Sequence, residues 1–379
     1  MDNQIYLDNA ATTQIKGEVF DVMLPYLKEN YHNPSARYGS GRESRIAIEK
    51  ARGQVADLIN ADPNEIYFTS GGTEANNWAF QIARGPDIRG YVLSDIIEHS
   101  SVYEAVARNK DNHIVMPDDE GFVDLEWLRM CAKRDDGLGF VSIMMANNEV
   151  GSVNPVKEIA EITHSCGAYF HTDAVQALGN LFIDVKDLGI DLMSMSSHKI
   201  YGPKGVGALY IESTVPKRPL LFGGGQERGM RSGTENVAGI VGFGKACELA
   251  KSNYKVHRKK VKALRDEFVK RVFEEIPDVV LIGARDMSKR LPGHASLAFE
   301  RVEAESLLMC LDREGICVSV GSACSSNELY PSRVIEYMGV PDNIKHSVVR
   351  FTFGDFNTKW EIPHIVEALK KYVSQLRTL

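Results

Sequence analysis

Two residues of this sequence are the first candidates for chemistry, a lysine and a cysteine. Lys199 follows two serines and a histidine in SSHK, between the apolar segments DLMSMSS and GALYI, which predicts a turn beside buried strands. A desolvated lysine loses its proton more readily and becomes a competent nucleophile for a Schiff base. A surface-turn lysine with its stem on apolar neighbours is the competing interpretation. Cys324 lies in GSACSSNELYPS, and a free thiol in an exposed loop is a candidate for function because it is chemically costly there.

Charged and glycine-rich segments add groups that could bind an anionic ligand. SGGTEANN at residues 70–77 predicts a strand-to-helix turn whose N–H groups could hold an anion, or a structural N-cap. In HTDAVQ, the Asp173 carboxylate could keep a heterocyclic nitrogen protonated, or cap the next helix. Arg350 lies in the apolar strand VVRFTF, where a buried guanidinium needs a carboxylate or phosphate partner. GGGQERGMRSGTEN at 223–236 could bind phosphate, reach a neighbouring subunit or simply turn.

The elements around these residues predict an α/β fold. Helical and strand patterns alternate from about residue 43 to residue 211, which indicates a mostly parallel sheet covered by helices on both faces. Ligands of such sheets bind beyond the carboxyl ends of the strands, where SGGTEANN, HTDAVQ and SSHK fall. A basic helical stretch, KSNYKVHRKKVKALRDEF, then leads into a smaller α+β lobe with strands in ASLAF, ICVSV and SVVRFTF.

Length and composition exclude several classes of protein. The 379 residues suit two lobes of roughly 100–200 residues each. A net charge of −7 argues against nucleic acid as a partner. No apolar run approaches a membrane span, and the first residues, MDNQIYLDNAATT, lack the basic residues of a targeting segment. We therefore expect a cytoplasmic protein without a membrane partner.

Cysteine usage indicates a reducing compartment. The six cysteines include no CxxC pair, so they predict neither a disulfide framework nor a zinc site. Apart from Cys324, we interpret them as small apolar residues: Cys131, Cys166, Cys247, Cys310 and Cys317.

These motifs together resemble those of the NifS/IscS cysteine desulfurases, in the class V branch of the fold-type-I pyridoxal-phosphate enzymes. The likeness runs in the family's order through YLDNAATT, NPS, SGGTEANN, EHSSV, NNEVG, HTDAVQ, SSHKIYGPKG, RSGTEN, GSACSS and VRFTFG. The resemblance implies a fold-type-I transferase whose large lobe, residues 13–255, holds a mostly parallel, seven-stranded-type sheet. Residues 1–12 with 256–379 would form the small α+β lobe that carries the cysteine loop. The working unit would be a homodimer.

The resemblance also implies a role for each matching residue. Lys199 would carry pyridoxal 5'-phosphate, Asp173 would pair with its pyridine nitrogen, and the catalytic His99 would stack on its ring. Arg350 would clamp the substrate carboxylate, with Asn33 nearby. The other cofactor-binding residues would be Gly72, Thr73, Asn148, Gln176, Ser196, Ser197, His198 and, from a second subunit, Thr234.

The activity that the resemblance implies is conversion of L-cysteine to L-alanine. Cys324 would take the sulfur as a persulfide, for an iron–sulfur scaffold protein or another acceptor, and could act as a transient cluster ligand shared with the scaffold. A selenocysteine lyase or a member of the other desulfurase group, with the same fold and cofactor, is the first alternative, but RSGTEN and the long insert between Cys324 and Arg350 favour the NifS/IscS group. A catalytically idle assembly platform is the second alternative, and such a platform would need neither Lys199 nor Asp173.

Overall fold

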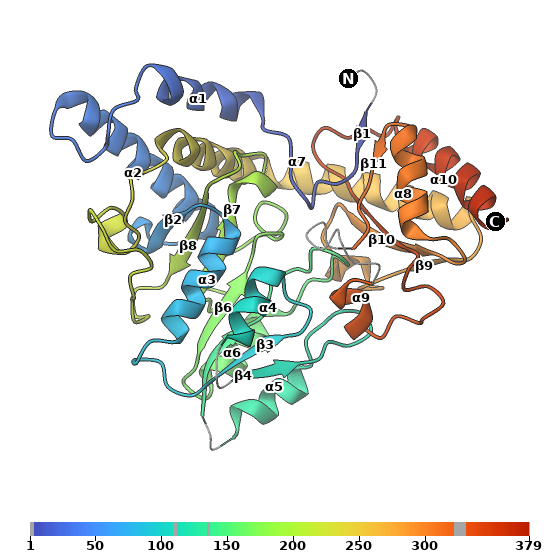
Figure 1. The fold of residues 1–379 in the computed structure, drawn as a ribbon, viewed down its shortest axis with the longest axis horizontal. Helices are drawn as coiled ribbons and strands as arrows, with labels where there is room; N and C mark the ends of the chain where they lie inside the picture. The colour runs from blue at the N-terminus through green and yellow to red at the C-terminus, as the bar shows by residue number, and fades with distance from the viewer. Residues whose placement is uncertain (1–3, 109–111, 135–136, 322–330, 379) are drawn as a thin grey trace.

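A sheet of seven strands forms the centre of the large lobe (Figure 1). The structure, a computed structural model, describes residues 4–108, 112–134, 137–321 and 331–378. The strand order is β2-β8-β7-β6-β5-β3-β4, and all neighbours are parallel except β8, which is antiparallel to β2 and β7. The predicted mostly parallel sheet is therefore confirmed. Its strands are β2 (Ile66–Thr69), β3 (Tyr91–Asp95), β4 (Asn112–Val115), β5 (Leu138–Ser142), β6 (Tyr169–Asp173), β7 (Leu192–Ser196) and β8 (Gly207–Ile211).

Helices cover both faces of this sheet, because successive strand residues are apolar on both sides. Phe140 of β5 packs with Trp78 of α3 on one face, and its neighbour Val141 packs with Ile159 of α6 on the other. The helices of this lobe are α1 (Gly17–Lys28), α2 (Gly39–Ile59), α3 (Gly72–Ala83), α4 (Ser100–Ala107), α5 (Leu125–Ala132) and α6 (Val156–His164). Short 3-10 turns are η1 (Pro63–Glu65), η2 (Ser197–Lys199), η3 (Glu227–Gly229) and η4 (Met287–Lys289).

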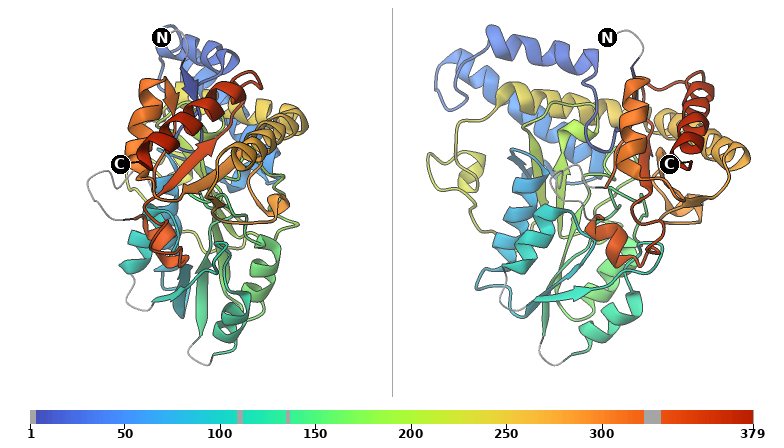
Figure 2. Two further views of the ribbon diagram at one scale, coloured as in Figure 1. Left: turned by 90° about the vertical axis from the view of Figure 1, so that its right-hand side faces the viewer. Right: turned by 45° about the vertical axis from the view of Figure 1, so that its right-hand side comes forward.

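One long helix, α7 (Val237–Glu275), joins the two lobes (Figure 2). Phe243 near its start belongs to the core of the large lobe, and Phe268 near its end belongs to the core of the small lobe. The basic stretch that predicted a linking helix is thus part of α7. The predicted division between residues 255 and 256 falls inside this helix and stays a prediction.

The small lobe is an α+β unit. Its antiparallel sheet has the order β12-β10-β9, and a parallel pair joins β1 at the N-terminus to β11. Leu7, just after β1, is fully buried in the core of this lobe, so the chain begins in the small lobe before it enters the large one. The elements are β1 (Ile5–Tyr6), β9 (Val279–Leu281), β10 (His294–Phe299), β11 (Ile316–Cys317), β12 (Val348–Thr352), α8 (Ala304–Arg313), α9 (Arg333–Tyr337) and α10 (Ile362–Leu376).

The cysteines of the described residues are unpaired and at least partly buried, as predicted. Cys131 and Cys247 are buried, whereas Cys166, Cys310 and Cys317 are half-buried. Among the described residues no group of three or more His, Cys, Asp and Glu side chains could hold a metal ion. The described helices include none that is long and apolar enough to cross a membrane.

Candidate active site

A cavity of about 460 Å³ lies at the carboxyl ends of β6 and β7, against the small lobe. Its volume is in the range of small-molecule and cofactor sites. Three parts of the chain line it: strand ends and turns of the large lobe, Ala10 and Ala11 after β1, and residues 331–334 with Arg350 of the small lobe. The polar and glycine residues of its wall are Gly72, Thr73, Asn76, Glu98, His99, Ser100, Ser101, Asn148, Glu149, Asp173, Gln176, Ser196, His198, Lys199, Ser332, Arg333 and Arg350.

Asp173 presents a fixed carboxylate to this cavity. It is the last residue of β6 and is 5% exposed. Its Oδ2 accepts a hydrogen bond of 2.7 Å from Nδ2 of Asn76, and its Oδ1 accepts one of 2.9 Å from the N–H of Val175. The two donors hold the carboxylate in one orientation, so Asp173 can pair with a cationic or N–H group of a ligand.

His99 lies beside this carboxylate as the N-cap residue of α4. Its Nδ1 accepts the N–H of Ser101 at 3.1 Å and pairs with the Ser101 hydroxyl at 2.8 Å. Burial lowers the pKa of His99 below its ordinary value, although the nearby Asp173 charge acts in the opposite direction. Because Nδ1 accepts the N–H of Ser101, the proton of the neutral ring lies on Nε2.

Lys199 ends the short turn η2 that follows β7, so the end of a buried strand places its amine at the cavity. Nζ donates to the carbonyl oxygens of Ala10 and Ala11, with 2.7 Å to Ala11. Gln176 also donates to the Ala10 carbonyl, at 2.9 Å. The neighbouring His198 contacts Thr12 Oγ1 at 3.1 Å, and burial, with Lys199 nearby, lowers the pKa of His198 to about 4.

The wall near the first turn of α3 can hold an anion. The first N–H groups of a helix have no acceptor within the helix, and its dipole favours negative charge there. Gly72, Thr73, Ser196 and His198 line this part of the cavity. A Cβ at Gly72 would lie 2.8 Å from a methyl group of Val175, so only glycine fits this close approach.

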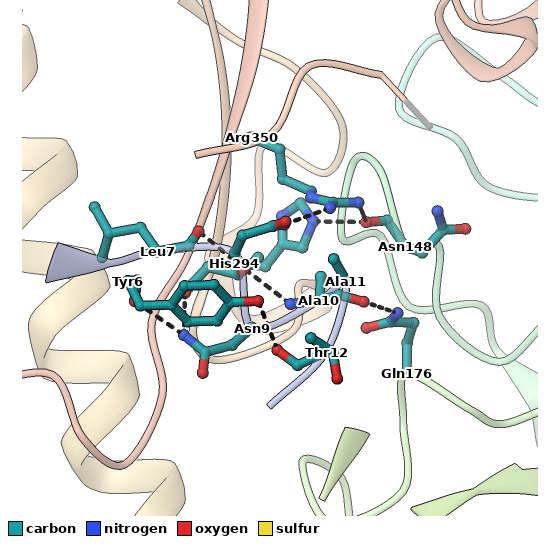
Figure 3. Close-up of polar contacts among 12 residues, drawn as sticks. Tyr6, Leu7, Asn9, Ala10, Ala11, Thr12, Asn148, Gln176, His294 and Arg350 are labelled. Carbon is teal, nitrogen blue, oxygen red and sulfur yellow. Dashed lines mark hydrogen bonds and ion pairs between the residues drawn. The ribbon is translucent and has the colours of Figure 1, made fainter. Parts of the chain in front are cut away.

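Arg350 adds a cation to the wall of the cavity. It lies on β12 with 4% of its side chain exposed, and it donates to the Asn148 carbonyl at 2.8 Å (Figure 3). Its second terminal nitrogen pairs with Asp8 Oδ1 at 2.7 Å. The prediction that this buried guanidinium needs a carboxylate partner is confirmed.

Known proteins with a similar sequence or fold agree on one family. The family model described as aminotransferase class-V matches residues 5–365. A cysteine desulfurase IscS of Clostridium botulinum is 45% identical over 385 aligned positions, which cover 100% of this chain and 96% of that protein. The chain belongs to the class-V aminotransferase family, in its cysteine desulfurase branch.

Solved structures of related proteins share the whole fold. One, titled a NifS-like protein, matches with a TM-score of 0.91 and 34% identity, over 98% of this chain and 100% of its own. Another, titled SspA in complex with cysteine, matches with a TM-score of 0.80 and 29% identity, over 94% of this chain and 100% of its own. The fold-type-I architecture predicted for this cysteine desulfurase family member is thereby confirmed.

The residues of this desulfurase cavity fit pyridoxal phosphate, the cofactor of the family. A carboxylate for a pyridinium N–H, an amine for an aldehyde and a helix N-terminus for a phosphate all face one space. Oδ1 of Asn76 is buried without a hydrogen-bond partner among the described residues. A buried polar atom left unpaired is costly, and it adds an acceptor to the wall that a bound ligand could use.

The structure brings most of the predicted site residues of the desulfurase together. Ten of them line the cavity: Gly72, Thr73, His99, Asn148, Asp173, Gln176, Ser196, His198, Lys199 and Arg350. Ser197 is buried outside it, with no hydrogen-bond partner for its hydroxyl among the described groups. Asn33 and Thr234 are exposed and do not line the cavity of their own chain. Cys324 lies outside the described residues, so its role stays a prediction.

Some residues of the site were not predicted from the sequence. Asn76 stands three positions after Thr73, which puts both on one helix face, so a signal for it was present in SGGTEANN. Glu98 is fully buried, and its burial, with Asp95 and Asp173 nearby, raises its pKa well above the ordinary value. Asp8 lies in YLDNAATT, and the sequence around it indicates no role for its carboxylate.

Proposed function

We propose that this protein is a pyridoxal-phosphate-dependent cysteine desulfurase. It converts L-cysteine to L-alanine and transfers the sulfur atom to Cys324. The observation that carries this proposal is the convergence of Lys199, Asp173 and Arg350 on one cavity. An amine, an anion and a cation in that arrangement suit the aldehyde and ring nitrogen of the cofactor and the carboxylate of an amino acid. Family membership and the cysteine-bound relative support the same substrate.

The residues of the cavity divide the binding of the cofactor between them. Lys199 would hold it covalently, and Asp173 would keep a proton on its ring nitrogen. The first turn of α3, with Ser196 and His198, would hold its phosphate, while His99 would lie over its ring. Bound there, the cofactor supplies an electron sink for the bonds at the substrate Cα.

Substrate binding and proton transfer fall to two residues that line the cavity, Arg350 and Lys199. Arg350 would bind the α-carboxylate by charge-assisted hydrogen bonds, which orients the amino acid with its Cα near Lys199. The Lys199 amine would accept and return the Cα proton. Gln176 and Asn148 would contact the ring hydroxyl.

Sulfur transfer requires a thiolate as nucleophile. The Cys324 thiolate would attack the substrate sulfur, so that an S–S bond forms as the Cβ–S bond breaks. The electron pair of the broken bond stays on the substrate carbon skeleton, and protonation at Cβ then yields alanine. Cys324 is left as a persulfide. The sulfur could pass to an iron–sulfur scaffold protein or another acceptor, with Cys324 as a transient cluster ligand at that stage.

We further propose a homodimer that works in the cytoplasm. Phe20, Leu24 and Leu27 follow one another at helical spacing on α1 and are 47%, 47% and 61% exposed, and Phe222 is 86% exposed. Contiguous exposed apolar side chains favour burial against a partner. Phe222 directly precedes the glycine-rich segment that contains Thr234, which would bring Thr234 to the second active site.

The test is to treat the purified, cofactor-loaded protein with L-cysteine. We expect stoichiometric persulfide on the peptide that contains Cys324, seen as one extra sulfur mass, and repeated turnover to alanine in the presence of a reducing thiol. Cys324→Ala should lose turnover but keep the cofactor absorbance, and Cys317→Ala, a half-buried cysteine on β11, is the matched control. Turnover of cysteine by Cys324→Ala at the wild-type rate would contradict a persulfide mechanism, and turnover of selenocysteine alone would favour a lyase.

A further inference from the structure

The segment of residues 7–13 connects the small-lobe strand that carries Arg350 to the turn that carries Lys199. On the small-lobe side, the N–H of Thr352 donates to the Leu7 carbonyl at 2.7 Å, and the N–H of Ala10 donates to Thr352 Oγ1 at 2.9 Å. On the large-lobe side, the N–H of Thr13 donates to the His198 carbonyl at 2.9 Å. The segment is therefore hydrogen-bonded at both ends.

Within this segment, Asp8 holds the guanidinium of Arg350. The 2.7 Å contact is the only ion pair that Arg350 makes among the described residues. Arg350 lines the cavity, whereas Asp8 does not, so Asp8 holds the guanidinium from outside the cavity. The Asn148 carbonyl accepts from the other terminal nitrogen, and Nε is buried without a partner among the described groups.

This arrangement leaves the arginine incompletely satisfied. A guanidinium has five N–H donors, and Asp8 and Asn148 take one from each terminal nitrogen. A buried cation is unfavourable without a counterion, and removal of its partner is strongly destabilising. Asp8 thus supplies the charge that lets Arg350 stay buried, while donors remain for a second anion.

We propose that Asp8 is a positioning residue for the substrate carboxylate. It holds Arg350 in the orientation in which its remaining donors face the cavity, and the backbone from Asp8 to Ala11 sets that cation at a constant distance from the amine of Lys199. The segment thereby selects amino acids, which carry a carboxylate and a reacting carbon at a set separation, over amines without a carboxylate. This inference rests on the proposed function.

The test compares Asp8→Ala and Asp8→Asn with the wild-type holoenzyme. We expect Asp8→Ala to raise KM for L-cysteine by about tenfold or more with a much smaller change in kcat, because it weakens binding of the substrate carboxylate. Asp8→Asn keeps an acceptor oxygen without the charge and should be intermediate. In an Arg350→Gln background, Asp8→Ala should change KM by less than about twofold, since two residues that act as one unit are not additive.

Binding without turnover gives an independent readout. The absorbance of the bound cofactor can be titrated with L-alanine, which has the carboxylate, and with cysteamine, which lacks it. Asp8→Ala should weaken the binding of L-alanine and leave the binding of cysteamine unchanged. Asp278→Asn removes another carboxylate, which pairs with the exposed Arg301, and is the matched control. The melting temperature of each variant shows whether it folds. If Asp8→Ala does not fold, the isosteric Asp8→Asn is compared with the wild type instead.

Three results would overturn the role of Asp8. The first is an unchanged or lower KM for L-cysteine in both variants, and the second is a loss of cysteamine binding equal to the loss of L-alanine binding. The third is an effect of Asp8→Ala on KM that is as large in the Arg350→Gln background as in the wild type. A wild-type protein that makes no alanine would refute the proposed function instead. The L-alanine titration would still decide the role of Asp8 in that case, because it needs only the loaded protein.

Discussion

The amine of Lys199 donates a hydrogen bond of 2.7 Å to the carbonyl oxygen of Ala11. These residues are 188 positions apart in the chain, and the contact joins the turn after β7 to the segment after β1. The carbonyls of Ala10 and Ala11 therefore orient the amine toward the cavity that both residues line. The amine is thus held at the cavity wall, where it can reach the aldehyde of a bound cofactor, as the covalent role that we propose for Lys199 requires.

The first prediction concerns this lysine. Borohydride treatment of the yellow holoenzyme should fix the cofactor to the peptide that contains Lys199, and peptide mass spectrometry should locate it there. Lys199→Ala should lose cysteine turnover by about 10³-fold or more, because it removes both the attachment and the base. Lys204, five positions further along, is the control site. A label on Lys204 would refute the assignment.

A second prediction concerns the support of Asp173 by Asn76. Asp173→Asn should lower kcat by about 10²- to 10⁴-fold, because a neutral amide cannot keep the ring nitrogen protonated. Asn76→Ala should have a smaller effect of about tenfold, since Asp173 keeps its second donor, the N–H of Val175. Steady-state kinetics and the cofactor spectrum measure both effects.

The control for Asn76 lies next to it on α3. Asn77 is exposed and donates to the Thr73 carbonyl within its own helix, so Asn77→Ala should leave kcat nearly unchanged. Equal losses in the Asn76 and Asn77 variants would mean that the effect comes from the helix rather than from the hydrogen bond to Asp173.

The third prediction is complementation between subunits. Lys199→Ala and Thr234→Ala are each defective, but a mixed dimer has one site with both residues intact. Random exchange of subunits should restore intact sites to about a quarter of all sites. The measurement is alanine production before and after exchange, with sedimentation to establish the dimer. No gain above the sum of the separate variants would contradict a shared site.

The fourth prediction concerns stability at the glycine-rich segment. Arg52 of α2 and Glu227 form two hydrogen bonds, of 2.7 and 2.8 Å, and each side chain is 4% exposed. Arg52→Ala would leave the Glu227 carboxylate buried without its cation and should cost about 3–5 kcal/mol in the free energy of unfolding. Urea denaturation measures this, with Arg129→Ala as the control. Arg129 makes only half-exposed pairs, which are worth about 0–1 kcal/mol.

The fifth prediction is a pH dependence of stability from His171. This residue is fully buried between the hydroxyls of Ser142 and Ser194, and burial lowers its pKa from 6.5 to about 3. The unfolded chain therefore binds a proton below pH 6.5 that the folded protein does not, so stability falls as the pH falls. From pH 6.5 to pH 5 this group should account for about 1.5 kcal/mol of lost stability. His171→Gln should remove that part of the loss, as measured by urea denaturation at both pH values.

His164, whose pKa is raised rather than lowered, provides the control. The hydrogen bond that the His164 ring donates to the Asp191 carboxylate raises the pKa of His164, so this pair stabilises the fold below pH 6.5, and that contribution is lost as the pH rises through the raised pKa. His164→Gln should therefore make the acid-side loss of stability slightly larger rather than smaller. A fall in stability that is unchanged in His171→Gln would contradict the assignment.

Much of the fold follows from local sequence. Alternating helical and strand patterns predicted the mostly parallel sheet and its helices, and two glycines before a threonine predicted the turn into α3 at Gly72. Strand ends were also predictable, because apolar runs stop where Asp173 and Ser196 begin polar turns. Parallel strands bring such ends to one edge, which predicts that SGGTEANN, HTDAVQ and SSHK meet there. The roles of the other site residues follow from the resemblance to the desulfurases.

The sequence by itself determined which residues stand at strand ends and helix starts, because these features depend on spacing over a few positions. Tertiary structure alone decided the long-range pairings. Nothing near Asp8 in the chain indicates Arg350, 342 positions away, and nothing in α2 indicates that Arg52 pairs with Glu227. Charged side chains carry no local sign of their partner, and burial selects the partner only when the packed lobes exclude water from both groups.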